Sequence, residues 1–378
     1  MAIRSDQQNP HTQPRKPHPV FNNWDVVTEG WYIVCRSAEL GPETVLSRNV
    51  NQQRICVWRA ASGRVYAMDG FCPHMGVDLG IGKVVGERLR CFFHHWEYGA
   101  DGHCKHIPIQ SEIPARARLQ TYACQEAYGF VWVHPDPETQ TRVLEVPSLE
   151  GRPVTWRHGK VFERSCHYHI TMINGIDPQH LRTVHGIHMD MELSIEQAMP
   201  HLVDIELSGK TPETTPIEKL VKKVLGPRYA YSMKYADGCV AALTTMKGVS
   251  FFGRTGILPE MHMLFAYQLL EPGRVQVQPI YVTLKRPGLG GWLAERLCLW
   301  MTKMGFYALQ GEDGKVYDNI SFNTQNLLAM DAPVARYVQY INRLKPSRWS
   351  RRDLGDGETA LRQATEPAKQ DQQAPSTN

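Results

Sequence analysis

Short apolar runs separated by turn residues dominate the first third of the chain. The β-branched and aromatic runs lie at 31–34, 54–58, 65–68 and 129–133. Runs of this length and composition are typical of strands joined by turns. This pattern therefore predicts a small antiparallel β domain over residues 23–135.

Helix-like and strand-like patterns mix further along, so we expect residues 154–350 to form a second, α+β domain. The clearest strands are expected at 240–252 and in a hairpin, where 261–270 and 275–284 flank the turn Glu271-Pro272-Gly273. The segments expected to be helical are 178–185, 290–309 and 332–344.

Three segments fit neither pattern. Residues 1–22 and 351–378 have little apolar content, which is typical of disordered tails. The polar segment 136–153, which begins with Asp136-Pro137, is expected to link the two domains.

One later segment, from Trp292 to Leu309, is strongly apolar but is interrupted by Glu295, Arg296 and Lys303. These charges argue against a transmembrane span. A buried helix is the first interpretation. An interface with another protein or a contact with a membrane surface stays open.

Composition narrows the class of protein. The length of 378 residues favours two domains over one. The first residues are polar and lack the apolar stretch of a secretory signal, so we expect a cytoplasmic protein. Nine cysteines in such a chain are expected to stay reduced or to bind metal. The net charge of +4 does not indicate nucleic-acid binding, although it would tolerate an acidic electron-transfer partner.

The first group of candidate metal ligands pairs cysteines with histidines. Cys72 and His74 form a C-x-H pair, and after sixteen residues Cys91 and His94 form a C-x2-H pair. Two thiolates and two imidazoles in this order suit a [2Fe–2S] cluster in which one iron binds the cysteines and the other binds the histidines. The alternative is a zinc site, but structural zinc motifs usually pair two cysteines and then two histidines.

This segment resembles the Rieske domain of ring-hydroxylating and related oxygenases, over roughly residues 24–135. Phe92 stands where that family usually has proline, and His95 stands where it often has glycine. His95 could compete with His94, but the family spacing favours His94. The nearby residues expected to be packing or surface groups are His103, Cys104 and His106.

A second group of candidate ligands lies between Asn174 and Gly186, where His180 and His185 are five residues apart. Two histidines and one carboxylate form a ligand set for iron(II) that leaves coordination positions open for O2. Five residues of an ideal helix rotate a side chain by about 140°, so this pair needs a local π-type turn to face one ion.

Local signals predict a short helix around these histidines. Asp177 can cap it, Pro178 fits its first position, and Gly186 can end it. The pattern D-x2-H-x4-H resembles the iron motif of the same oxygenase family, which implies both histidines as ligands. Other histidines crowd the region, namely His167, His169 and His188, and the last is the main rival of the second ligand.

The resemblance also implies residues beyond the two histidines. The family's third iron ligand is a carboxylate in an acidic helix after the last strands, and Asp313 fits best, with Glu312 and Asp318 as alternatives. Asp177 matches the family's acidic residue that bridges the two metal centres across a subunit interface. Helix capping alone is the other interpretation of this residue. Asn174 is a further catalytic candidate.

The resemblance predicts a β Rieske domain followed by a helix-grip-like α+β catalytic domain in a homotrimer. The catalytic segments look most like the group of ketosteroid hydroxylases, cholesterol desaturases, aminopyrrolnitrin oxygenase and prodigiosin-type oxidative cyclases. The chain has no G-x-G-x-x-G after a strand, so electrons from NAD(P)H are expected to arrive through a separate flavin reductase, with or without a ferredoxin.

The substrate is expected to be hydrophobic and cyclic or aromatic. The residues that either line its pocket or form plain core are Phe251, Phe252, Met261, Met263 and Phe265. Hydroxylation is the first expectation for the reaction. Desaturation, N-oxygenation, demethylation and oxidative cyclisation stay open, and a non-catalytic Rieske electron carrier is the remote alternative.

Overall fold

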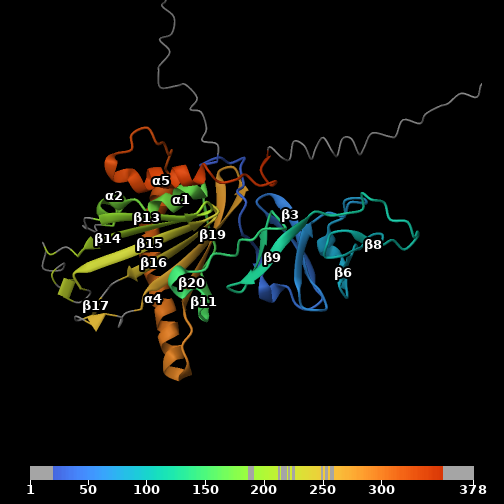
Figure 1. The fold of residues 1–378 in the computed structure, drawn as a ribbon, viewed down its shortest axis with the longest axis horizontal. Helices are drawn as coiled ribbons and strands as arrows, with labels where there is room; N and C mark the ends of the chain where they lie inside the picture. Colours follow the sequence, from blue (N-terminus) through green and yellow to red (C-terminus); the bar gives the residue numbers. More distant parts are fainter. Residues whose placement is uncertain are drawn as a thin grey trace, which may run out of the picture.

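Two antiparallel sheets build the N-terminal domain, as Figure 1 shows in blue and cyan. The computed structural model describes residues 20–185, 191–211, 213, 219, 222–223, 226–247, 250–251, 254–255 and 259–351. The six-stranded sheet has the order β1-β10-β9-β4-β3-β2, with strands β1 (Tyr32–Arg36), β2 (Val45–Val50), β3 (Gln53–Arg59), β4 (Val65–Asp69), β9 (Thr121–Ala127) and β10 (Phe130–His134). The four-stranded sheet contains, in order, β5 (Lys83–Val85), β6 (Arg88–Arg90), β7 (Glu97–Tyr98) and β8 (Cys104–His106).

Strand β3 separates two hydrophobic cores, because its alternate side chains point to opposite faces. Ile55 and Val57 pack into a large core that includes residues of both domains. Cys56 and Trp58 pack into a smaller core that also contains Cys72 and other residues near the four-stranded sheet. This double burial explains why the run reads as continuously apolar instead of alternating.

The second domain is built on an antiparallel sheet with the order β11-β20-β19-β16-β15-β14-β13, in which β12 also pairs with β20. Its strands are β11 (Val154–His158), β12 (Phe162–Arg164), β13 (Met191–Met199), β14 (Leu202–Lys210), β15 (Arg228–Ala236), β16 (Val240–Lys247), β19 (Met261–Glu271) and β20 (Arg274–Leu284), beside a small hairpin of β17 (Ser250–Phe251) and β18 (Arg254–Thr255). The helices are α1 (Tyr168–Asn174), α2 (Pro178–Thr183), α4 (Gly288–Tyr317) and α5 (Ala332–Ile341), and the 3-10 turns are η2 (Ser37–Glu39), η3 (Leu79–Ile81), η4 (Pro147–Leu149) and η5 (Ala329–Asp331). The α+β expectation is confirmed, and so is the β19–β20 hairpin, in which Glu271 pairs with Arg274.

Several expected boundaries are wrong. The helix expected at 290–309 extends from Gly288 to Tyr317, which brings the acidic segment into the same helix. The helix expected at 332–344 ends at Ile341. The N-terminal tail was expected to reach residue 22, yet Val20 and Phe21 are buried. Both donate their backbone N–H groups to the Asn342 side chain, at 3.2 and 2.9 Å, a contact between the two ends of the chain that no local pattern reveals.

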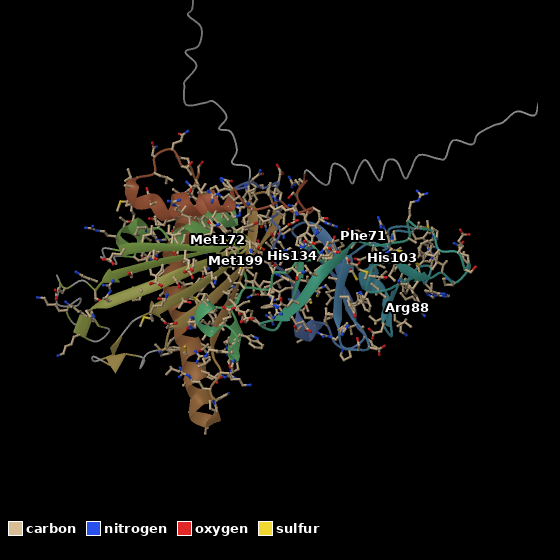
Figure 2. All side chains as sticks on the ribbon, viewed as in Figure 1. Phe71, Arg88, His103, His134, Met172 and Met199 are labelled. Carbon is tan, nitrogen blue, oxygen red and sulfur yellow. The ribbon has the colours of Figure 1, made fainter. Side chains whose placement is uncertain are left out.

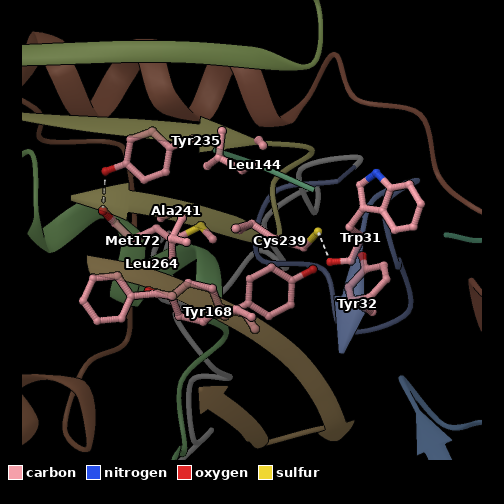
Figure 3. Packing of buried hydrophobic residues seen from close by; sticks show 14 of the residues in the cluster. Trp31, Tyr32, Leu144, Tyr168, Met172, Tyr235, Cys239, Ala241 and Leu264 are labelled. Carbon is pink, nitrogen blue, oxygen red and sulfur yellow. Dashed lines mark hydrogen bonds between the residues drawn. The ribbon is translucent and has the colours of Figure 1, made fainter. Parts of the chain in front are cut away.

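The two domains share a buried interface, part of which Figure 3 shows. Trp31 and Tyr32 lie beside Cys239, whose thiol donates to the Trp31 carbonyl at 3.6 Å. On the same boundary, the Leu269 N–H donates to the Asn51 side chain at 2.8 Å. The expected linker contributes as well, because Leu144 and its apolar neighbours are buried in this core. The domains are therefore packed together and not simply tethered.

No helix among the described residues is both long and apolar enough to span a membrane. Figure 1 shows α4 projecting beyond the sheet of the second domain. The helix contacts β20, β19, β11 and α1.

Candidate metal centres

Two loops of matching geometry carry the Cys/His pairs of the first domain. The first follows β4, and the Cys72 N–H donates to the Val77 carbonyl at 2.9 Å. The second follows β6, and the Cys91 N–H donates to the Trp96 carbonyl at 2.8 Å. Each hydrogen bond joins the cysteine to the fifth residue after it and so closes the loop. Both thiols are thereby held at the base of their loops, where they are buried.

The fourth residue after each cysteine has a left-handed backbone. This residue is Gly76 in the first loop, with φ of 75°, and His95 in the second, with φ of 58°. Glycine adopts this conformation freely, whereas a residue with a Cβ is strained in it. His95 therefore fills a corner of the loop, while the imidazole of His94 lies 4.5 Å from that of His74, measured between ring centroids. This geometry favours His94 over His95, as the sequence spacing does.

Aromatic side chains hold the two exposed imidazoles. Trp96 stacks on His74, with ring centroids 4.4 Å apart and an interplanar angle of 9°. The ring centroids of Phe93 and His94 are 3.8 Å apart. These contacts fix the orientation of both rings.

The thiols have their own supporting group in Tyr98. Its hydroxyl lies 3.1 Å from the Cys72 sulfur. Burial raises the pKa of this phenol far above its usual range, so the hydroxyl keeps its proton and can donate it to a cysteine thiolate. Burial is also the main cause that raises the pKa of Cys72, and proximity to Cys91 adds to it. Two adjacent buried thiols below two exposed imidazoles fit a Rieske [2Fe–2S] cluster.

The other candidate ligands of this domain lie elsewhere. Cys104 belongs to β8 and donates its thiol to the His106 carbonyl at 3.4 Å. His103 and His106 are exposed. They are packing and surface groups, as expected from the sequence.

The second candidate centre begins at α2. The last turn of this helix is wider than an α-helical turn, as the spacing of the two histidines requires. The Val184 N–H donates to the His180 carbonyl at 2.8 Å, and the His185 N–H approaches the same carbonyl at 3.4 Å. The second contact spans five residues and is the π-type turn predicted from the sequence. It brings the two imidazoles to a centroid distance of 5.2 Å.

Asp313 of α4 completes this group. Ligand atoms of His180, His185 and Asp313 all lie within 4.8 Å of one another. The Nε2 atom of His185 is 3.0 Å from Oδ1 of Asp313. That oxygen is buried and has no hydrogen-bond partner among the described residues. Two imidazoles and a carboxylate gathered this closely fit a two-histidine, one-carboxylate iron(II) site.

Hydrogen bonds fix which nitrogen each histidine presents. Nδ1 of His180 donates to the Asp177 carbonyl, and Nδ1 of His185 donates to Glu312 at 3.0 Å. Both Nε2 atoms are left as lone-pair donors for a metal. Burial lowers the pKa of His180, which favours the neutral form that a ligand requires.

The remaining sequence candidates have different surroundings. Glu312, an alternative iron ligand in the sequence, instead holds His185, a role that only the helical register of α4 reveals. Asp318 caps the end of α4 and accepts from the Ser165 hydroxyl at 3.5 Å. Asp177 caps α2, because its Oδ1 accepts from the Gln179 N–H at 2.8 Å. His188 lies outside the described residues.

A cavity of about 330 Å³ opens beside the second centre, and all three candidate ligands line it. Its wall is predominantly apolar and includes Met261, Met263 and Phe265, so these residues belong to a pocket and not only to the core. Asn174 lines the same cavity. Phe252 lies outside the described residues, and the side chain of Phe251 is not described.

The two candidate centres lie in different halves of the molecule. Figure 2 shows Phe71, which precedes Cys72, in the N-terminal domain, and Met172 of α1 in the other domain. Figure 1 likewise separates β6 and β8 from α2.

Comparisons with known proteins bear on the N-terminal domain through sequence and on the fold of the chain through structure. Residues 30–123 match the Rieske [2Fe-2S] domain family. The chain is 36% identical to cholesterol 7-desaturase of Xenopus laevis over 176 residues, which are 44% of this chain and 37% of the relative. It is 30% identical to aminopyrrolnitrin oxygenase PrnD of Pseudomonas fluorescens over 189 residues, which are 46% of this chain and 50% of the relative. The chain thus spans at most half the length of these curated relatives.

The fold extends the likeness to nearly the whole described chain. A crystal structure of dicamba monooxygenase bound to 3,6-dichlorosalicylic acid matches with a TM-score of 0.57 and 18% identity, and the match covers 84% of this chain and 98% of the other. The domain match thus shows a Rieske [2Fe-2S] domain in the N-terminal part of the chain, and the chain as a whole is similar in fold to dicamba monooxygenase.

Proposed function

We propose that the chain is the terminal oxygenase component of a multicomponent system that uses O2 to oxidise a hydrophobic cyclic or aromatic substrate. One observation carries this proposal, namely that His180, His185 and Asp313 converge on the wall of an apolar cavity. A substrate held in that cavity lies directly beside the candidate iron site. The relatives that act on sterols and aromatic compounds support the same substrate class.

The residues that fit iron define two sites. We assign Cys72, His74, Cys91 and His94 to the [2Fe–2S] cluster, and the two α2 histidines with Asp313 to Fe(II). Iron(II) in such a site supplies the reductive activation of O2 when bound. The chain orients the ligands: Glu312 and the Asp177 carbonyl hold the imidazoles, while the apolar wall excludes water and places a substrate bond near the site.

Electrons are proposed to come from NAD(P)H through a separate flavin reductase, with or without a ferredoxin. They enter at the exposed imidazoles His74 and His94. Because the cluster and iron sites of one chain lie in different halves, we propose that transfer runs to the iron of a neighbouring copy in a homotrimer. Asp177 is proposed to bridge a cluster histidine and an iron histidine across that interface, in addition to capping α2.

The position of the substrate decides the outcome of the reaction. Hydroxylation is our first assignment, and desaturation, N-oxygenation, demethylation or oxidative cyclisation would follow from a different bond lying nearest to the iron. The names of the relatives include a desaturase and an oxygenase of an amine. A Rieske electron carrier would not need the second site or its cavity.

Iron counting and turnover together test the proposal. An oxygenase with both centres filled holds three irons per chain, whereas a carrier holds two. Purified protein should be red-brown, and its reduced cluster should give a Rieske-type paramagnetic resonance signal. Incubation with a reductase, NADH and labelled O2 should then incorporate label into, or desaturate, a member of a panel of steroids, aromatics and pyrrolic compounds. Colourless, zinc-loaded protein would overturn the assignment.

A further inference from the structure

The outer side of α4 presents a continuous apolar surface. Leu289 is 76% exposed, Leu293 is 55% exposed and Leu297 is 57% exposed. Trp292, Trp300 and Met304 extend the same surface and are also exposed. Their spacing of three and four residues puts them on one side of the helix, while Cys298, Leu299 and Thr302 are buried on the other. A patch of this kind on a soluble domain marks a contact surface.

The exposed charges between Lys285 and Met304 all have one sign. Lys285, Arg286 and Arg296 are exposed, and Lys303 is half-buried. Arg296 lies over the Trp292 ring at 5.1 Å, and Lys303 lies over the Tyr307 ring at 5.7 Å. The acid of the segment, Glu295, is only 6% exposed.

Glu295 does not neutralise these cations, because its carboxylate faces the protein. It accepts a hydrogen bond from the Thr155 hydroxyl at 2.9 Å and another from the Arg286 N–H. The surface from Lys285 to Met304 is therefore apolar and basic, with no exposed acid.

We propose that this surface, which we call the α4 face, docks on an anionic lipid bilayer. Leucines on one side of a helix, tryptophans and a row of cations are the features that place a helix in the plane of a membrane interface. Acidic headgroups attract Lys and Arg residues near the surface. The helix lies on the membrane and does not cross it.

A second copy of the chain is the main rival occupant, and charge disfavours it. Pairing two α4 faces would place Arg296 and Lys303 of both copies in one interface, with no exposed acid between Lys285 and Met304 to separate the like charges. In an anionic bilayer, the acidic headgroups attract the same cations, and the leucines are buried among the lipid chains.

The opposite side of α4 connects this docking to substrate access, an inference that rests on the proposed function. Thr302, Phe306 and Gln310 of that side line the cavity beside the candidate iron site. One helix would thus touch the bilayer with its outer face and the cavity with its inner face. A hydrophobic substrate dissolved in the membrane would reach the cavity along α4 without passing through water.

Vesicle flotation tests the docking. The full chain should float with vesicles of equal parts phosphatidylcholine and phosphatidylglycerol, and poorly with phosphatidylcholine alone. The double variant Leu293→Glu, Leu297→Glu should lose flotation. The variant Arg296→Gln, Lys303→Gln should bind about fivefold more weakly for each cation removed. Ile109→Glu is the matched control, because Ile109 is 91% exposed in the other domain, and it should float like wild type.

A second measurement keeps the result independent of folding. Brominated lipids should quench tryptophan fluorescence in wild type, and less in Trp292→Phe, Trp300→Phe, with unchanged iron content in every variant. Absence of flotation, or flotation unaffected by the leucine changes, overturns the proposal. So does an oligomer that the leucine changes dissociate in the absence of vesicles, which would assign the face to a second copy. Neither assay measures turnover, so failure here leaves the proposed oxygenase activity standing, and the converse also holds.

Discussion

The two cluster loops differ in the residue that occupies their left-handed position. His95 has a φ of 58° where the equivalent residue of the first loop is Gly76. A residue with a side chain loses about 1 kcal/mol or slightly more of folding stability to backbone strain in this region. Replacing it with glycine removes the strain, but part of that gain is lost because glycine makes the unfolded chain more flexible. We therefore expect His95→Gly to stabilise the cluster-loaded protein by up to about 1 kcal/mol, measured by denaturant unfolding.

Gly76→Ala is the matched control for this expectation. A Cβ at Gly76 would meet no atom within 4 Å, so the substitution adds backbone strain and no clash. It should destabilise the protein by about 1 to 2 kcal/mol. If His95→Gly were instead destabilising, the His95 side chain would be making a contact worth more than the strain.

Substitutions of Asp313 and Glu312, two adjacent acids of α4, are expected to affect iron binding very differently. Asp313→Ala should lose the mononuclear iron and all turnover, while the cluster spectrum is unchanged, because the anionic ligand is removed. Glu312→Gln should keep the iron but weaken its binding by about tenfold, because Glu312 holds a ligand and is itself 56% exposed. Metal analysis and paramagnetic resonance measure both effects, with Asp318→Ala as a control near wild type. Loss of iron in Glu312→Ala but not in Asp313→Ala would refute the ligand assignment.

Helix α2 shows how much of a site a short element determines. Its cap, its proline and its widened last turn all follow from a dozen consecutive residues, so the sequence predicted them. Asp313 lies in an element far along the chain, and a family resemblance was needed to select it. The role of Glu312 depends on the register of α4, and burial of Phe21 depends on contacts with the other end of the chain. Local physics cannot supply contacts of that range.

The cap of α2 carries a prediction of its own. Asp177→Asn keeps a good helix cap but removes the charge and one acceptor. Under the proposed bridge, both metal centres stay occupied while electron transfer from the reduced cluster to the iron slows by orders of magnitude. Single-turnover reoxidation of the cluster, with substrate and O2 present, measures this rate. A wild-type rate in the variant would leave Asp177 as a helix cap alone.

At the scale of the whole molecule, the separation of the two centres predicts that neighbouring copies complement each other. A chain with Asp313→Ala keeps its cluster, and a chain with His74→Ala and His94→Ala keeps its iron site. Each should be inactive alone. Co-expressed in equal amounts, they should restore about a quarter of wild-type turnover, because in a random cyclic assembly one junction in four joins an intact cluster to an intact iron site.

The alternative, transfer within one chain, predicts no activity in the same mixture, because no chain holds both centres. Two measurements make the result decisive. Mass analysis must show mixed assemblies. The two variants should also stay inactive when they are mixed after purification under conditions where subunits do not exchange. Restored turnover in mixed assemblies alone would mean that the catalytic unit is the interface between two copies and not the single chain. The buried contacts between the domains would then serve to fix the cluster of one copy at the correct position for the iron of the next.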